Sequence, residues 1–393
     1  MTAEHIALME PMLPAIGNKE LEDLAMVLAK KSSTLAGTMT PAVRQSIGNL
    51  VRAMNCYYSN LIEGHDTHPR DIDKALAGDF SKDSAKRNLQ LEAMAHIEVQ
   101  QLIDAGHAPA IKPSGEFMRW AHHAFCSRLP DELLWVGNPD TGERLKVIPG
   151  QFRQRAVVVG QHIPPLAENL DRFMRRFEEA YDPARLSLVQ QVIAIAASHH
   201  RLLWIHPFLD GNGRVVRLFS HAWLLEIGIG SSLWSVSRVL ARNVEEYKAR
   251  LKAADAPRKG NLDGRGNLGH EELVKFCRFF LTTAIDQVDF MSELLDSANL
   301  IARMSIHIQE EVALKRLHKG SFELLREAWI AGEFKRGQAS AITGYKERAA
   351  RDVLTTLLEK GYLVSDNKLA PVRLGFPADA VERWLPRLYP ATN

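Results

Sequence analysis

Apolar residues recur along most of the chain at the three- and four-residue spacing of an amphipathic helix. The first such stretch predicts a helix because its apolar positions follow one helical face. Those positions are Leu21, Leu24, Ala25, Leu28 and Ala29. The same spacing predicts further helices over residues 50–58, 88–105, 116–129, 166–180, 186–200, 214–227, 234–250 and 271–285. The chain is therefore expected to be mainly α-helical.

Residues 137–160 depart from this helical spacing. Turn-forming residues cluster over 137–142. The stretches 144–148 and 155–159 have the composition of short strands, and residues 149–153 separate them. The pattern predicts a small β-hairpin inside a helical protein. Taken by itself, this hairpin is interpreted as a solvent-exposed connection.

The last quarter of the chain has a pattern of its own. Residues 286–318 predict one long charged helix, and the pattern restarts at Gly320. It then predicts a helix over 322–331, a short helix over 337–344, a third helix over 346–360 and two short strands within 363–373. A helix, a helix–turn–helix and a hairpin in this order indicate a winged helix-turn-helix domain.

A length of 393 residues is enough for two or three domains. We expect an N-terminal helical region over 1–110 and a central core over 111–290. A connecting helix over 291–319 and the winged-helix domain over 320–393 would follow.

The composition by itself excludes few classes of protein. Hydrophobic residues make up 46% of the chain and charged residues 24%, which is ordinary for a globular protein. The formal net charge of +2 gives no general electrostatic reason to expect nucleic acid or a membrane as a partner. Cys56, Cys126 and Cys277 are scattered, a usage typical of a reducing compartment. The prediction is a cytoplasmic protein with neither a secretory signal nor a membrane-spanning segment.

The candidate chemistry lies in residues 206–217, His-Pro-Phe-Leu-Asp-Gly-Asn-Gly-Arg-Val-Val-Arg. The imidazole of His206 can accept a proton near neutral pH. The carboxylate of Asp210 is a hard oxygen ligand suited to Mg²⁺. The pattern around them predicts one helix, a tight loop and a second helix that begins near Gly211.

Such a loop would hold an anion against the N-terminus of the second helix. Glycines on both sides of Asn212 let the backbone approach an anion closely. Arg214 and Arg217 are three residues apart, so they share a face of the helix and can neutralise phosphate oxygens. Residue by residue, an ordinary loop between helices would explain each feature. The whole string is too specific for that interpretation.

The string matches the signature His-Pro-Phe-x-Asp/Glu-Gly-Asn-Gly-Arg-x-x-Arg at every fixed position, so the chain resembles the Fic family. The resemblance implies a Fic helical bundle with a small β-hairpin flap that pairs with the backbone of a target protein. It also implies AMP transfer from ATP to a Ser, Thr or Tyr hydroxyl of a protein, the enzyme itself included. Mg²⁺ would be the cofactor.

Each residue of the string then takes an implied role. By resemblance, His206 is the catalytic base and Asp210 is the Mg²⁺ ligand. The implied nucleotide-binding residues in the string are Gly211, Asn212, Gly213, Arg214 and Arg217.

A second motif lies far upstream. Ser59, Glu63 and Gly64 fit the inhibitory motif Ser/Thr-x-x-x-Glu-Gly/Asn of many Fic proteins. Without the resemblance, the segment would be interpreted as a helix end with a glycine cap. The resemblance implies that Glu63 pairs with Arg217. A carboxylate there occupies the place of the terminal phosphate and repels the triphosphate, so the enzyme would be autoinhibited.

Asn243 and Tyr247 are the remaining site candidates. They are four residues apart and therefore share one face of the helix predicted over 234–250. Helices after the motif shape the nucleotide pocket of Fic proteins, so the resemblance implies that both residues contact the adenine. The alternative is two ordinary polar residues on an amphipathic helix.

A zinc site is not favoured. His122 and His123 are adjacent on a predicted helix, where neighbours diverge by about 100°. We interpret them as packing or surface residues. The chain also lacks HExxH and Walker A patterns.

Three functional alternatives stay open. A Fic enzyme of this kind could remove AMP or transfer another phosphate-containing group. A nucleotide-sensing transcription regulator could bind DNA through residues 320–393, although their 11 basic and 9 acidic residues give only about +2. A protein-interaction or homodimer surface is the other interpretation of that region. A purely structural Fic core is the third alternative, and the intact motif argues against it.

Overall fold

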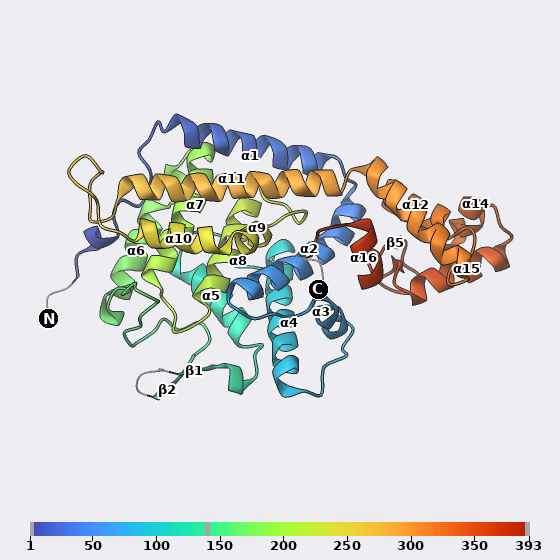
Figure 1. Ribbon diagram of the computed structural model, residues 1–393, viewed down its shortest axis with the longest axis horizontal. Coiled ribbons are helices and arrows are strands. Elements are labelled where there is room, and N and C mark those ends of the chain that lie inside the picture. The colour runs from blue at the N-terminus through green and yellow to red at the C-terminus, as the bar shows by residue number, and fades with distance from the viewer. Residues whose placement is uncertain (1–3, 138–141, 390–393) are drawn as a thin grey trace. The chain divides into compact units, whose positions relative to one another are not determined.

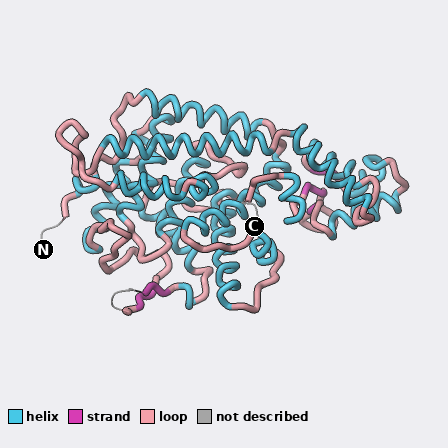
Figure 2. Tube along the Cα trace, in the orientation of Figure 1, coloured by secondary structure: helices cyan, strands magenta, loops and turns pink. Residues whose placement is uncertain are grey.

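The computed structural model describes residues 4–137 and 142–389. Helices make up most of this part of the chain (Figures 1 and 2), which confirms the expected mainly α-helical fold. The turn expected over residues 137–142 lies largely outside the described residues. Among the described residues, no helix combines the length and the apolar character needed to span a membrane.

The chain divides into two compact units. The first comprises the residues up to Ser33 together with Asn55–Ser231 and Ser235–Gln287. The second comprises Thr34–Met54, Ser232–Trp234 and the residues from Val288 onward. The pattern did not indicate that residues 34–54 group with the C-terminal part. The finer domain boundaries stay a prediction.

The helices, in chain order, are α1 (Lys19–Gly37), α2 (Pro41–Ile62), α3 (Pro69–Leu76), α4 (Ser84–Asp104), α5 (Gly115–Cys126), α6 (Leu170–Ala180), α7 (Leu188–Ile205), α8 (Asn212–Glu226), α9 (Ser237–Arg242), α10 (Val244–Ala254), α11 (His270–Leu294), α12 (Ser297–Ala313), α13 (Ser321–Ile330), α14 (Ala339–Thr343), α15 (Glu347–Glu359) and α16 (Ala378–Trp384). The strands are β1 (Trp135–Gly137), β2 (Arg144–Lys146), β3 (Glu333–Phe334), β4 (Leu363–Val364) and β5 (Val372–Leu374). Short 3-10 helices are η1 (Ile6–Met9), η2 (Asp131–Leu133), η3 (Ala167–Asn169), η4 (Pro183–Arg185) and η5 (Arg336–Gln338).

The first unit is built around α7 and α8. A capping box starts α7, because Ser187 Oγ accepts the Gln190 amide and the Gln190 side chain accepts the Ser187 amide. From Val192 onward α7 is buried, and its alanines allow neighbouring helices to approach closely. Helices α4 and α5 pack against α8, and α6 packs against α7. The N-terminus of α8 therefore has a fixed place in the core.

The second unit contains a three-stranded antiparallel sheet in the order β3-β5-β4. Its elements follow the order α13, β3, α14, α15, β4, β5, which agrees with the predicted sequence of helices and final strands. The short strand β3 and the helix α16 were not predicted. The identity of this unit as a winged helix stays a prediction.

The predicted hairpin is displaced along the chain. Strand β1 pairs with β2, with Val136 opposite Leu145, so residues 144–146 form the second strand and not the first. Residues 155–159 form no strand beyond an isolated bridge between Val159 and His162. The cause is Arg153, whose backbone amide and guanidinium bind the carbonyls of residues 205–207. These bonds tie the chain to the loop after α7 and prevent it from folding back onto β2.

Two predicted helices are each interrupted. The helix predicted over 234–250 is divided into α9 and α10, because Asn243 adopts φ −115° and ψ 36° and so leaves the helical region. The long helix predicted over 286–318 is also two helices, α11 and α12. Asp296 lies between them and caps α12 by accepting the Asn299 amide at 3.0 Å. The sequence did not indicate that Asp296 is a helix cap, because it is one charged residue among many in this segment.

Candidate active site

The loop between α7 and α8 is held from outside by Arg153. Its Nε donates to the His206 carbonyl at 2.7 Å and its Nη2 to the Pro165 carbonyl at 2.5 Å. Its own backbone amide donates to the Pro207 carbonyl at 2.8 Å. The guanidinium is buried, so these charge-assisted bonds form away from competing water. They hold His206 in the left-handed conformation that ends α7, with φ 50°.

The side chain of Asn212 closes the loop from inside. Its Oδ1 accepts the Phe208 amide and its Nδ2 donates to the Phe208 carbonyl, both at 2.9 Å. Gly211, which precedes α8, has φ 77°, a conformation that favours glycine. The amide side chain of Asn212 is therefore fully used within the loop. Only the backbone of Asn212 is left to meet a ligand.

His122 supports the same loop from α5. Its ring stacks on Phe208 with centroids 4.0 Å apart. Its Nδ1 accepts the Gly150 amide at 2.9 Å, so its Nε2 carries the proton that faces the Asp210 carbonyl at 3.2 Å. Burial lowers the pKa of His122 to about 4, so the ring is neutral. The structure thus agrees with the interpretation of His122 as a packing residue.

The supports of the loop act on its main chain, and the imidazole of His206 is hydrogen-bonded to the backbone of Leu203 in α7. Burial, reinforced by the charge of Arg153, lowers the pKa of His206 to about 4. The imidazole is therefore in the neutral form that a general base requires. Asp210 exposes its carboxylate to solvent. Both groups lie on the residues that immediately precede the N-terminus of α8.

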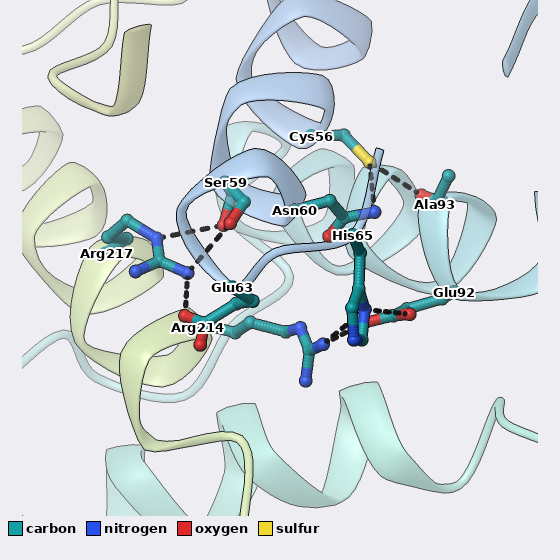
Figure 3. A network of polar contacts seen from close by, with 9 residues as sticks. All are labelled: Cys56, Ser59, Asn60, Glu63, His65, Glu92, Ala93, Arg214 and Arg217. Atoms are coloured by element: carbon teal, nitrogen blue, oxygen red, sulfur yellow. Dashed lines mark hydrogen bonds and ion pairs between the residues drawn. The ribbon is translucent and has the colours of Figure 1, made fainter. Parts of the chain in front are cut away.

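Arg217 is held by the end of α2 (Figure 3). Its Nη2 donates to Glu63 Oε1 at 2.5 Å, and its Nε donates to Ser59 Oγ at 2.9 Å. Burial raises the pKa of the Glu63 carboxyl, but the charges of Arg217 and Arg214 outweigh this and hold it below its ordinary value. The structure therefore brings together the two motifs that lie about 150 residues apart in the sequence.

Two glycines make this contact possible. Gly64 has φ 86° and ends the turn after α2. Gly213 lies in the first turn of α8, and a Cβ there would overlap Glu63 Oε1. The Glu63 carboxylate consequently lies directly against the positive end of the α8 dipole. An anion at this place is stabilised by the helix N-terminus and by Arg217 together.

Arg214 has a different partner. Its Nη2 forms an ion pair with Glu92 of α4, and both side chains are almost fully buried. His65 Nδ1 lies 2.8 Å from Glu92 Oε2 and 3.3 Å from Arg214 Nη2. Neither Glu92 nor His65 was indicated by the sequence pattern, since each is a single polar residue in its segment.

Asn243 and Tyr247 differ in their exposure to solvent. Asn243 is exposed at the junction of α9 and α10, whereas Tyr247 is buried. Ser220 donates to the Val216 carbonyl, so His199 Nδ1–H donates to Ser220 and His199 Nε2 accepts from the Tyr247 hydroxyl at 2.7 Å. Tyr247 therefore completes a core hydrogen-bond chain, and the two residues do not present one common face.

A cavity of about 530 Å³ lies beside His206. Its walls come from the turn at residues 159–162, from α7 and from α10. The lining residues are Val159, Gly160, Gln161, His162, His200, Leu203, Trp204, His206, Lys248, Leu251, Lys252 and Asp255. His200 Nε2 faces Asp255 Oδ1 at 3.1 Å, which fixes that carboxylate at the wall. Neither Asn243 nor Tyr247 lines this cavity.

Comparison with known proteins shows which family the part of the chain around this loop resembles. Residues 117–224 match the Fic/DOC family. The chain is 42% identical over 79 residues to the protein adenylyltransferase Fic of Drosophila erecta, covering 20% of this chain and 16% of that protein. It is 32% identical over 98 residues to the protein of the same name from Nematostella vectensis, covering 25% and 23%. The matches thus span less than a quarter of these relatives.

Solved structures agree at the level of the fold. A Fic family protein from Desulfovibrio desulfuricans has a TM-score of 0.54 with 16% identity, over 92% of this chain and 98% of that chain. A Fic-domain-containing signalling protein from Bacteroides thetaiotaomicron has a TM-score of 0.50 with 19% identity, over 68% and 95%. The Fic/DOC match therefore lies on the helices α5 to α8, which carry the loop.

We predict that Tyr247→Phe destabilises the protein by about 1–3 kcal/mol, because it leaves the buried His199 Nε2 without a donor. Chemical unfolding followed by circular dichroism measures this. Asn243→Ala is the matched control, since Asn243 is exposed, and its free energy of unfolding should change by less than about 0.5 kcal/mol. An unchanged stability of Tyr247→Phe would contradict the structural role of the hydroxyl.

Proposed function

We propose that this protein transfers AMP from ATP to a serine, threonine or tyrosine hydroxyl of a protein, and that Glu63 keeps the resting enzyme inactive. One observation carries the proposal. The loop before α8 carries a neutral His206 and the exposed carboxylate of Asp210. It leads into the N-terminus of α8, and the first turns of that helix carry two arginines. The names of the relatives support a transferase of this family.

The reaction uses these groups in a single displacement. The target hydroxyl oxygen attacks the α-phosphorus, and the bond from that phosphorus to the bridging oxygen breaks, so pyrophosphate leaves. His206 accepts the hydroxyl proton as the new bond forms. Backbone amides of Gly211, Asn212 and Gly213 at the start of α8 stabilise the charge on the phosphate oxygens.

Asp210 fits a Mg²⁺ ion that arrives with ATP. Mg²⁺ commonly takes one or two carboxylates and completes its octahedron with phosphate oxygens and water. A single exposed carboxylate beside an anion site suits this arrangement. Among the described residues, no cluster of three or more His, Cys, Asp or Glu side chains offers a metal cage of its own. Bound there, Mg²⁺ supplies positive charge against the phosphates.

We place the nucleoside of ATP in the cavity beside His206. Its size suits a nucleoside, and Leu203, Trp204 and Leu251 offer apolar surface for a base. The carboxylate of Asp255, fixed by His200, is an acceptor for ribose hydroxyls or for an exocyclic amine. His206 lines the same cavity, so a nucleoside here would lie beside the proposed catalytic base. This assignment replaces the expected adenine contacts of Asn243 and Tyr247 as our proposal.

Autoinhibition follows from charge and space. The carboxylate of Glu63 occupies the N-terminus of α8 and satisfies Arg217. A terminal phosphate needs the same arginine and the same helix end. Glu63 therefore competes with ATP bound in the productive position. Its side chain is one-third exposed, so it can move without unfolding the core.

Further expectations about partners and location stay predictions. The hairpin β1–β2 is the candidate for pairing with the backbone of a target protein, and the enzyme itself is a candidate target. The alternatives remain DNA contact through residues 320–393 and a homodimer. Removal of AMP, or transfer of another phosphate-containing group, is the alternative for the reaction. Cys56, Cys126 and Cys277 are all buried and unpaired, which supports the expected cytoplasmic location.

We predict that His206→Ala abolishes AMP transfer, because no other group on the loop accepts the hydroxyl proton. Labelled ATP and intact-mass analysis measure the transfer in a Glu63→Gly background. The variant should stay folded and lose only about 1 kcal/mol of stability, since the imidazole of His206 has one hydrogen bond to the backbone of Leu203. Full residual activity would refute the assignment of His206 as base.

We also predict that Glu63→Gly raises auto-modification by at least tenfold, since Arg217 and the end of α8 become free for the terminal phosphate. Intact-mass analysis with ATP, CTP, GTP and UTP in turn identifies the transferred group, and a cell lysate serves as a source of targets. Glu63→Gln is the matched control, because it keeps the shape but removes the charge and should activate less. If Glu63→Gly is no more active than the parent chain, the inhibitory role is wrong.

A further inference from the structure

The two arginines on the first turns of α8 pair with carboxylates from different segments of the chain (Figure 3). Glu63, which binds Arg217, follows the last turn of α2 and has a side chain that is 32% exposed. Glu92, which binds Arg214, lies in the middle of α4 and has a side chain that is only 6% exposed. A residue in the turn after a helix can move more easily than one in the centre of a packed helix. Glu92 thus stays with Arg214 in every state that keeps the core folded.

His65 joins the Glu63 segment to this buried pair. Arg214 has only donors and Glu92 has only acceptors. The proton on His65 Nδ1 therefore points to Glu92 Oε2, 2.8 Å away. The Asn60 carbonyl accepts the backbone amides of both Glu63 and His65, at 3.0 and 2.9 Å. One turn consequently presents Glu63 to Arg217 and His65 to Glu92.

The end of α2 is also fastened to α4 behind this turn. Cys56 Sγ donates to the Ala93 carbonyl at 3.4 Å, next to Glu92 in the sequence. Arg214 Nε is buried without a partner among the described residues. The guanidinium also lies over the ring of Phe125, 5.1 Å from its centroid, so Glu92 is its carboxylate partner and Nε keeps unused donor capacity.

We propose that Glu92 is the positioning residue for Arg214, and that His65 uses Glu92 as the second anchor of the inhibitory segment. The inference rests on the proposed AMP transfer. Arg214 is then a permanently oriented donor, whereas Arg217 is the arginine that inhibition switches on and off. The segment is released completely only when both the Glu63–Arg217 and the His65–Glu92 contacts are broken.

A double-mutant cycle tests the positioning role. In the Glu63→Gly background, Glu92→Gln should lower kcat at least tenfold, because Arg214 loses its orientation. The same change should have no further effect once Arg214→Gln is present. Glu98→Gln is the control, since Glu98 is a half-exposed carboxylate on the same helix that pairs with Arg128, and kcat should not change. Equal losses in the presence and absence of Arg214 would refute the role.

A conservative variant covers the case in which Glu92→Gln does not fold. Glu92→Asp keeps the charge but shortens its reach by one methylene. It should lower kcat at least threefold with Arg214 present and not at all with Arg214→Gln. A normal kcat for Glu92→Asp in both backgrounds would also overturn the proposal.

His65→Ala tests the anchor in the chain that retains Glu63. Auto-modification should rise severalfold, yet less than in Glu63→Gly, and should rise no further when the two changes are combined. Asp66→Ala, a change at the exposed neighbouring residue, is the control and should have no effect. If Glu63→Gly is active and His65→Ala shows no activation, only this inference fails. If Glu63→Gly is itself inactive, the proposed function fails.

The pH dependence of His65→Ala activity, relative to that of the parent, distinguishes an anchor from a histidine that only packs in the structure. His65 faces Glu92 of α4, Arg214 of α8 and Glu63 of its own segment, and its hydrogen bond to Glu92 raises its pKa. The anchor is therefore fully present below about pH 6.5, the ordinary histidine value, and weakens as pH rises through the raised pKa. The ratio of His65→Ala to parent activity should be largest at low pH and fall as pH rises. A ratio that does not depend on pH would refute the anchor.

Discussion

The structure depends on the positive N-terminus of α8 and on what neutralises it. The helix dipole and two arginines on its first turns meet at one place. Without a nucleotide, such a concentration of positive charge in a largely buried site is costly unless carboxylates oppose it. Glu63 and Glu92 supply them. The resting state is therefore stabilised by the same electrostatics that would bind a triphosphate.

The loop separates the groups that build it from the groups that can react. Asn212 binds the backbone of Phe208, Arg153 binds the carbonyl of His206, and His122 faces the carbonyl of Asp210. All three supports act on main-chain atoms. Because the backbone is fixed in this way, the loop does not rely on the side chain of Asp210, and the imidazole of His206 adds only a hydrogen bond to the Leu203 backbone. A site of this kind is rigid before its ligand arrives, which is what preorganised electrostatic stabilisation requires.

Much of this site was predictable from the sequence because many of its residues lie in short, contiguous motifs. Residues 206–217 form a contiguous string, and Ser59, Glu63 and Gly64 fit a second short motif, so the predicted Glu63–Arg217 pair was found at 2.5 Å. The residues that were missed act over long sequence distances. Glu92 and Arg153 are single charged residues without a local pattern, and only tertiary packing brings them to the loop. The hairpin was misplaced because bonds from Arg153 outweigh the strand propensity of residues 155–159.

Glu63 and Glu92 carry the same chemical group but differ in how easily they can move. This difference allows the site to neutralise both arginines and still bind a nucleotide under the proposed function. A permanent partner for both arginines would leave no charge for ATP, whereas mobile partners for both would leave the resting site poorly neutralised. Glu92 lies in a packed helix and Glu63 directly follows the end of α2. Under the proposed function, Arg214 would therefore keep its orientation while Arg217 exchanges one anion for another. The turn at Asn60 couples the two pairs, because the amides of Glu63 and His65 share its carbonyl. Under the proposed function, a phosphate that displaces Glu63 would also disturb the His65–Glu92 contact, so entry of the nucleotide and release of the inhibitory segment would be one linked equilibrium.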